Sequence, residues 1–517
     1  MQSMAFPDRL EFCPRLKLPP PEVVQLEALA ESGETVDKAP GILNPFSDII
    51  SPPAVEGDKI IPQAPVLPED IFSRSPEKGA FILQKYLDAL PESERYAAFE
   101  PLVRKHWKWL CKAAPYLKFP EPKPIFGGLP INIGIRIWGL TGGGTERVMQ
   151  VLANHFGKDP RYHVTIFIDA RQARRIDYPL HENVTIVGVA PGERTDWKEV
   201  IEKYPQDVVI CPEYHSARNA QNILLLKFLG VRVFAQEHNP PFYSHPFTTS
   251  DEKFSHFPSL YSACDAMSCL SQADAYKWKK EGMRNSIYLP NPPTFDPNSV
   301  SPSTLEPHSI LWVGSLVPWQ KRPEMAIEVF AKVLQKVPTA RLIMVGAIHD
   351  RRCHRRCLQR IHELGIGHAV DIVGFQKDMA PIYSNGALLM STSRFEGWGM
   401  MIIEAKTFGL PVVSTAMPYL ETLNGGCIQT PPNDVDALAE AVVDLLENPE
   451  KRKQLGAEAR RDVVENFSNE VVFAKYEALI EAILTGSDAV AKFCAGEPLM
   501  DAETAEQMLA VEAKALK

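Results

Sequence analysis

Long apolar runs are missing from this 517-residue sequence, and none approaches the roughly eighteen residues that a membrane-spanning helix needs. The first residues, MQSMAFPDRLEFCPRL, also lack the apolar segment of a secretory signal. Nine cysteines, an odd number without disulfide-scaffold spacing, are typical of a reducing compartment. We therefore expect a cytoplasmic protein without a membrane span.

An excess of positive charge is also missing. The formal net charge is -9, whereas a protein that tracks nucleic-acid phosphates is normally basic overall, so nucleic acid is not expected as a partner. Apolar residues make up 45% of the chain, which is enough to form a buried core in each of two or three domains.

Convincing metal-binding motifs are absent too. The sequence Asp434-Val435-Asp436 spells D-x-D but follows two prolines and an asparagine, so its first aspartate is expected to begin a helix. A second pattern combines two cysteines and three histidines: Cys353, Cys357, His349, His354 and His362. Its spacing suits zinc on one helix face, yet the segment RRCHRRCLQR is basic enough to repel a cation. We expect no metal at either place.

The N-terminal quarter differs in composition from the rest. Residues 1–74 are rich in proline and acidic residues and should be extended or disordered. Residues 75–128 have helical spacing and predict a small helical appendage. Its end, residues 104–112, interleaves aromatic with basic residues. Two interpretations stay open: this helix packs on its own domain, or it makes a peripheral contact with an anionic membrane surface.

From residue 131 onwards, strands and helices alternate, which predicts an α/β fold with parallel sheets. A first strand runs into a glycine turn at residues 142–144, and further strands are expected at 163–169, 184–187, 207–211, 231–236 and 266–270. After a proline-rich hinge at 290–293 the pattern restarts, with strands at 309–314, 341–346 and 370–374. The chain should therefore contain two Rossmann-like domains.

Residues 391–415 are the most informative stretch. Small polar residues lead through Gly397 and Gly399 into an apolar run with helical spacing, so a helix should begin just after Gly399. Glycines at a helix start let a ligand approach the backbone N–H groups, which favour an anion such as phosphate. Glu396 and Glu404 flank this point and would accept hydrogen bonds from hydroxyl groups. Together these features suggest a nucleotide sugar.

This stretch resembles the E-x7-E signature of family 4 glycosyltransferases, also called glycosyl transferases group 1. The likeness rests on Glu396, Glu404, Ala405 and the residues 409–413, and weaker likeness extends over about residues 131–485. It implies retaining enzymes with the GT-B fold, in which two Rossmann-like domains face each other across a cleft. The implied domains are 129–295 for the acceptor and 296–467 for the donor, with residues 468–486 as a helix returning to the first domain. The tail, residues 487–517, is helical in spacing and has no assignment.

The resemblance also implies roles for individual residues. Glu404 would hold the ribose hydroxyls of the donor, Glu396 the donor sugar, and His238 would support the sugar side. Lys321 would neutralise the leaving diphosphate, and we expect the neighbouring Arg322 to help it. The backbone would line that diphosphate at Gly143, Gly144, Gly397, Trp398 and Gly399. Ser315 stands where the family usually has an arginine, and a neutral hydroxyl cannot offset charge.

The predicted function is transfer of a hexose from a nucleoside diphosphate sugar to a hydroxyl-bearing acceptor, such as a glycan or glycolipid, without a metal or other cofactor. One alternative is a glycan- or nucleotide-binding scaffold with weak or no turnover. A further alternative is a sugar-nucleotide epimerase or hydrolase of the same two-domain build. The sequence does not indicate the donor base, the donor sugar or the acceptor, because acceptor loops vary freely.

Overall fold

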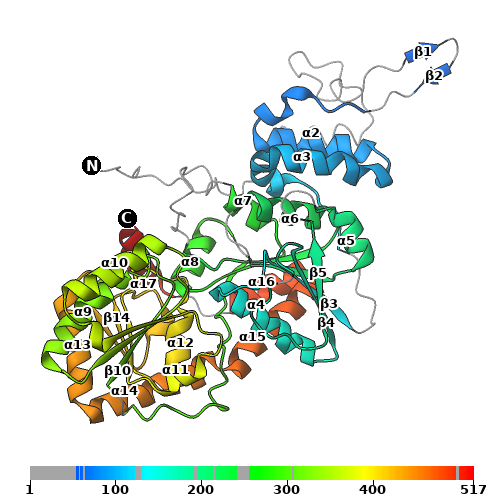
Figure 1. Ribbon diagram of the computed structural model, residues 1–517. Helices are drawn as coiled ribbons and strands as arrows, with labels where there is room; N and C mark the ends of the chain where they lie inside the picture. The colour runs from blue at the N-terminus through cyan, green and yellow to red at the C-terminus, as the bar shows by residue number, and fades with distance from the viewer. Residues whose placement is uncertain are drawn as a thin grey trace.

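The computed structural model describes residues 65–122, 130–173, 175–190, 195–212, 216–240, 256–283, 285–305, 308–496 and 500–516. It also describes the backbone of a small antiparallel hairpin, β1 (Ala54–Glu56) with β2 (Lys59–Ile61). Most of the predicted extended segment, residues 1–74, lies outside this described part. Figure 1 shows two α/β lobes with a helical pair set on top of the first lobe.

The helical pair consists of α2 (Pro76–Ala89) and α3 (Glu92–Ala113), preceded by the short 3-10 helix η2 (Glu69–Ser73). Ser75 begins α2 by accepting a hydrogen bond from the Lys78 amide. The pair packs on α6 (Ala217–Phe228) and α7 (Phe257–Ser262) of the first lobe, and they share one hydrophobic core (Figure 1).

The aromatic residues near the end of α3 also pack against other parts of the chain. The Trp109 indole donates to the Arg74 carbonyl, and Trp107 lies edge-on to His256. Packing on the chain's own domain, the first of the two interpretations, thus accounts for these aromatics without a membrane. In the described residues, no helix is both long and apolar enough to cross a bilayer.

The first lobe is built on a parallel sheet that has seven strands within the described residues. They are β3 (Ile131–Arg136), β4 (Tyr162–Asp169), β5 (Val184–Val189), β6 (Val208–Cys211), β7 (Arg232–Gln236), β8 (Ala266–Cys269) and β9 (Ser286–Tyr288). Their order is β5-β4-β3-β6-β7-β8-β9. The direction of the strand order reverses between β3 and β6, and a crevice forms at such a reversal in a parallel sheet. The turn after β3 lies at this crevice. That turn leads into α4 (Gly144–Lys158), and α5 (Trp197–Lys203) and α8 (Gln272–Lys280) complete the helices of this lobe.

The second lobe repeats this plan with six parallel strands among the described residues. These are β10 (Ser309–Val313), β11 (Arg341–Val345), β12 (Val370–Gly374), β13 (Leu388–Ser391), β14 (Val412–Thr415) and β15 (Cys427–Thr430), in the order β12-β11-β10-β13-β14-β15. Its helices are α9 (Pro323–Lys336), α10 (Arg351–Glu363), α11 (Ala380–Ser384), α12 (Met400–Thr407), α13 (Val435–Glu447) and α14 (Pro449–Asp462). Here the order reverses between β10 and β13, which are followed by residues 314–322 and 392–399. The predicted pair of α/β domains with parallel sheets is confirmed.

The C-terminal helices tie the two lobes together. Helix α15 (Asn469–Thr485) crosses to the first lobe, where Tyr476 is fully buried and accepts a hydrogen bond from the Gln236 amide. Helix α16 (Ser487–Gly496) packs beside it. Helix α17 (Ala502–Leu516), in the tail that the sequence left unassigned, packs on α8 of the first lobe, and Leu509 joins a core cluster of the second.

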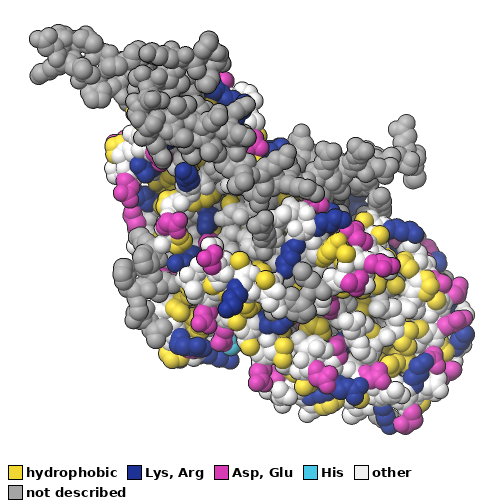
Figure 2. All heavy atoms as spheres, turned by 180° about the vertical axis from the view of Figure 1, so that it is seen from behind, with side chains coloured by type: hydrophobic (Ala, Val, Ile, Leu, Met, Phe, Trp, Pro, Cys, Tyr) yellow, Lys and Arg dark blue, Asp and Glu magenta, His cyan; other side chains and the backbone are white. Residues whose placement is uncertain are grey.

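The surface carries charges of both signs. Figure 2 shows basic and acidic side chains interspersed over the described part of the face turned away from Figure 1. This mixture differs from the basic stripe of a nucleic-acid-binding protein.

Candidate active site

A cavity of about 330 Å³ lies between the two lobes, at the carboxyl ends of the central strands of both sheets. The first lobe lines it with the glycine turn 142–144 and with the loop that follows β7. The second lobe contributes residues 313–315 at the end of β10 and residues 396–401, which lead into α12. Ligands of open parallel sheets bind at this edge, so the fold itself places the cavity where a substrate belongs.

The start of α12 is shaped by its two glycines. Gly399 caps the helix with φ 76°, a left-handed conformation that favours glycine. Position 397 requires glycine for a different reason, because a Cβ there would lie 2.0 Å from the carbonyl oxygen of His238 in the other lobe. A side chain at position 397 would push the lobes apart, so this glycine permits the close approach that forms the cavity.

Glu396 and Lys321 form an ion pair in the cavity wall. The Lys321 ammonium donates to a Glu396 carboxylate oxygen at 2.5 Å, and the two side chains are only 16% and 6% exposed. Both residues line the cavity. The resemblance assigned them to different parts of the donor, whereas the structure brings them into direct contact. A donor entering the cavity would meet an ammonium group that this carboxylate already holds in place.

Glu404 lies on the first turns of α12 and is 9% exposed. One carboxylate oxygen accepts a hydrogen bond from the Thr294 hydroxyl at 2.6 Å, and the other accepts one from the Tyr383 hydroxyl at 2.8 Å. Burial raises the pKa of Glu404, while these hydrogen bonds and the nearby Arg147 oppose the rise. Because a carboxylate oxygen has two acceptor sites, Glu404 keeps free lone pairs for hydroxyl groups of a ligand.

Two polar side chains of the first lobe face the same cavity. His238 follows β7, and burial lowers its imidazole pKa to about 4, so the ring is neutral at physiological pH. Its Nε2 atom and the Oδ1 atom of Asn291 are buried and have no hydrogen-bond partner among the described residues. Buried polar atoms are rarely left unpaired, which makes both atoms candidates for contact with a ligand. His238 is a candidate that the sequence indicates, whereas Asn291, in the proline-rich hinge, has no sequence motif that marks it.

Arg147 also lines the cavity and was not among the candidates expected from the sequence. It follows the glycine turn on the first turn of α4, and its guanidinium stacks 3.9 Å from the ring centroid of Tyr178. It therefore supplies a cation from the lobe opposite Lys321. The signal was present in the sequence: an arginine three residues after Gly144 falls on the first turn of a helix that points at the cleft.

Arg322 does not line this cavity, contrary to expectation. It has φ 51° at the start of α9, and its guanidinium turns away, donating to the carbonyls of Thr392 (2.7 Å) and Ser393 (3.4 Å) and to the Asn433 side chain. The side chain of Lys321 and that of Arg322 thus leave opposite faces of one loop. Ser315, Gly143 and Gly144 do line the cavity, and so does Trp398, whose indole packs against Phe467.

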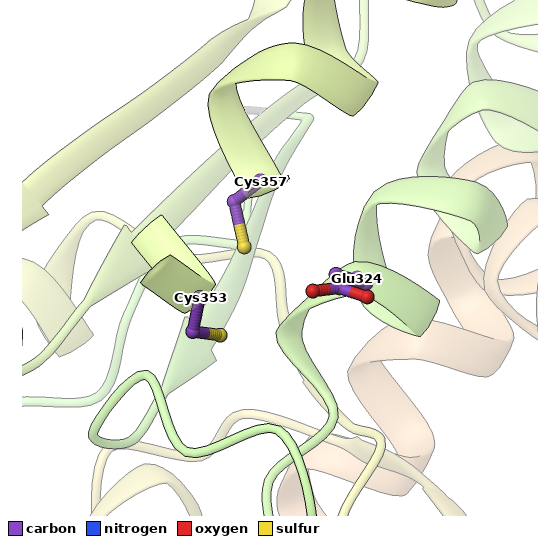
Figure 3. A group of neighbouring side chains, drawn as sticks. All are labelled: Glu324, Cys353 and Cys357. Carbon is purple, nitrogen blue, oxygen red and sulfur yellow. The ribbon is translucent and has the colours of Figure 1, made fainter. Parts of the chain in front are cut away.

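The two sequence patterns that resemble metal-binding motifs have other structural roles. Asp434 begins α13 by accepting a hydrogen bond from the Ala437 amide at 2.9 Å, which confirms its predicted role as a helix start. Cys353 and Cys357 point inward from α10, toward Glu324 at the start of α9 (Figure 3). Glu324 accepts from Arg356 at 2.5 Å, and burial raises the pKa of Cys357 to about 12. The Glu324 carboxylate is paired with Arg356, and the two thiols are protonated within a hydrophobic core cluster. These features favour a packing role over metal ligation.

Comparison with known proteins gives a family match within the second lobe. Residues 307–448 match the family described as Glycosyl transferases group 1. The N-acetyl-alpha-D-glucosaminyl L-malate synthase of Bacillus anthracis is 27% identical over 167 residues, which are 32% of this chain and 43% of that protein. An uncharacterized glycosyltransferase of Haemophilus influenzae is 23% identical over 373 residues, 68% of this chain and 98% of that protein. The chain thus spans less than half of the first relative and almost all of the second.

Solved structures show the same architecture. A sucrose-phosphate synthase from Thermosynechococcus elongatus superposes with a TM-score of 0.59 at 17% identity, covering 69% of this chain and 99% of that one. The Anabaena protein HepE, solved in complex with UDP-glucose, gives a TM-score of 0.56 at 16% identity, covering 68% of this chain and all of that one. These likenesses confirm the predicted GT-B fold.

Proposed function

We propose that this chain, which has the GT-B fold and matches the glycosyl transferases group 1 over residues 307–448, is a retaining glycosyltransferase. It would move a hexose from a nucleoside diphosphate sugar to a hydroxyl-bearing acceptor. HepE, which has the same fold, was solved with UDP-glucose, and this supports a nucleotide sugar as donor.

The observation that carries this proposal is the arrangement of charge around the interlobe cavity. Arg147 approaches from the first lobe and Lys321 from the second, and the glycine-capped helix starts of α4 and α12 open beside them. Cations and helix N-termini together favour a diphosphate. Glu404, with free lone pairs in a buried position, suits the hydroxyls of a ribose.

Catalysis in this scheme is mainly electrostatic. As the bond between the sugar and the diphosphate breaks, negative charge grows on the leaving group, and Lys321 and Arg147 stabilise that charge. Glu396 holds Lys321 in place through their ion pair and, in this scheme, would lie on the sugar side of the donor. The neutral His238 presents its unpartnered Nε2 on the sugar side.

The decisive experiment is product analysis with a panel of nucleoside diphosphate sugars and simple hydroxyl acceptors. A donor is selected first by thermal shift, because a ligand at about one hundred times its dissociation constant adds about 2.7 kcal/mol of stability. Transfer with retained anomeric configuration supports the proposal. Nucleotide binding without any turnover supports the scaffold alternative, and release of free sugar alone supports a hydrolase.

A further inference from the structure

A second cavity lies behind the loops that carry Lys321 and Glu396. It has a volume of about 590 Å³ and is lined by Arg322, Arg394, Thr415, Ala416, Pro418, Pro432, Asn433, Val511 and Lys514. Two of its cations come from the donor loops and the third from α17. It shares no lining residue with the interlobe cavity.

The charge in this second cavity is unbalanced. Its lining contains two arginines and a lysine and no carboxylate. Within the described residues, Arg394 and Lys514 have neither an ion pair nor a side-chain hydrogen bond, and Arg322 donates only to neutral acceptors. Burial, together with repulsion from the neighbouring Arg394, lowers the pKa of Arg322 to about 10. Two guanidinium groups held close together without a counter-ion form an environment that an anion would stabilise.

The remaining walls limit what this anion can be. Pro418, Pro432, Ala416 and Val511 give the cavity an apolar side, and its volume exceeds what an inorganic ion needs. The chemistry that fits is a phosphate monoester, whose oxygens meet the cations and whose carbon skeleton covers the apolar wall. We propose that this cavity is a binding site for a phosphorylated small molecule, distinct from the donor site.

An occupant would contact the donor loops from behind. Arg322 follows Lys321 directly, and the Thr392 hydroxyl donates to the carbonyls of both residues. The Arg394 amide donates to the Gln320 carbonyl, which joins the two loops again. A phosphate bridging Arg322, Arg394 and Lys514 would therefore clamp both loops to the last helix.

The test is titration calorimetry of the full chain with phenyl phosphate, whose ring matches the apolar wall. Arg394→Gln and Lys514→Gln should each weaken binding by about tenfold, the loss expected for one charge-assisted hydrogen bond. Arg147→Gln, which removes a cation from the interlobe cavity, should leave this binding unchanged. Phenol, which lacks the charge, should not bind.

Several outcomes would overturn the proposal. One is the absence of phenyl phosphate binding to the wild-type chain. Another is loss of binding in Arg147→Gln with retention in the other two variants, which would place the anion in the donor site. Equal binding by phenol would show that the apolar wall acts alone. If Arg394→Gln fails to fold by circular dichroism, Lys514→Gln decides, because Lys514 is an exposed residue on the last helix. None of these outcomes depends on sugar transfer, so the proposed function is tested separately.

Discussion

The ammonium group of Lys321 lies 2.5 Å from a carboxylate oxygen of Glu396, so the cation expected at the diphosphate is held by the carboxylate expected at the sugar. In a partly buried wall such a pair is short and well oriented. The pairing keeps Lys321 in a fixed place before a donor arrives. A preorganised charge of this kind stabilises a transition state without a cost of reorganisation at the moment of reaction.

Replacing Lys321 by alanine should reduce sugar transfer by at least ~3 kcal/mol in transition-state stabilisation, because the leaving diphosphate loses a preorganised cation and Glu396 loses its partner. The measurement is kcat/KM with the donor that the panel identifies. Lys332→Ala is the matched control, since Lys332 pairs with Asp436 on the outer surface. A Lys321→Ala variant as fast as the wild type would place the diphosphate elsewhere.

Arg147 and Arg322 should differ in their effect on nucleotide binding. Arg147→Gln should lower the affinity for a nucleoside diphosphate by about tenfold, because it removes a charged hydrogen-bond donor from the cavity wall. Arg322→Gln should change this affinity much less, since its guanidinium faces the second cavity. Calorimetry with the free nucleotide compares the two variants directly. The opposite ranking would restore the original assignment of Arg322 to the diphosphate.

Substitutions of Glu404 and Glu396 should have different effects. Glu404→Ala should lower the affinity for both the donor and the free nucleotide diphosphate. Glu396→Ala should lower turnover, with a smaller loss of nucleotide affinity. The reason is their position: Glu404 is buried on α12, and Glu396 lies in the preceding loop beside Lys321. Nucleotide affinity and kcat are measured for each variant. Equal losses of affinity would contradict this division of roles.

Transfer should continue after exhaustive treatment with EDTA. The growing charge on the leaving group is met in this scheme by Lys321, Arg147 and a helix N-terminus, and Asp434 already serves as a helix cap. Activity is compared before and after chelation, and again after addition of Mn²⁺ or Mg²⁺. Activity lost on chelation and regained with either cation would refute a metal-independent mechanism.

Stability should fall as the pH rises from about 6.5 to about 8, because Asp274 on α8 and Glu512 on α17 form a buried acid pair with raised pKa values. Burial, followed by the charges of Glu421 and Glu237, raises the pKa of Asp274 from 3.8 to about 8, while hydrogen bonding opposes the rise. Burial, followed by the charge of Asp274, raises the pKa of Glu512. In this pH window the folded chain keeps protons that the unfolded chain releases. Each such proton lowers the free energy of unfolding by up to about 1.4 kcal/mol per pH unit.

The measurement for the acid pair is the thermal midpoint as a function of pH. Glu512→Gln should flatten the dependence, since an uncharged amide removes one of the two raised pKa values. Glu503→Gln is a suitable control on an exposed position of the same helix. A midpoint independent of pH in the wild type, or an unchanged slope in Glu512→Gln, would contradict the role of this pair.

Much of the fold follows from local patterns. Apolar runs of strand length separated by amphipathic helices predicted the parallel sheets, and the structure has strands at the predicted places, such as β4 and β10. The short strand β9 and the docking of α17 were missed. A three-residue strand has too little periodicity to detect, and the packing of a polar-faced tail helix depends on surfaces distant in sequence.

The sequence by itself determined the α/β class, the helix start at Gly399 and the candidate residues Glu396, Glu404, Lys321 and His238, because these depend on spacing along a continuous segment. Only the tertiary structure decided how side chains from separate segments meet. It directed Arg322 away from the donor cavity, brought Arg147 into it and paired Lys321 with Glu396. The physical reason is that sequence spacing fixes where the backbone turns, whereas the direction of a side chain depends on partners supplied by the rest of the fold.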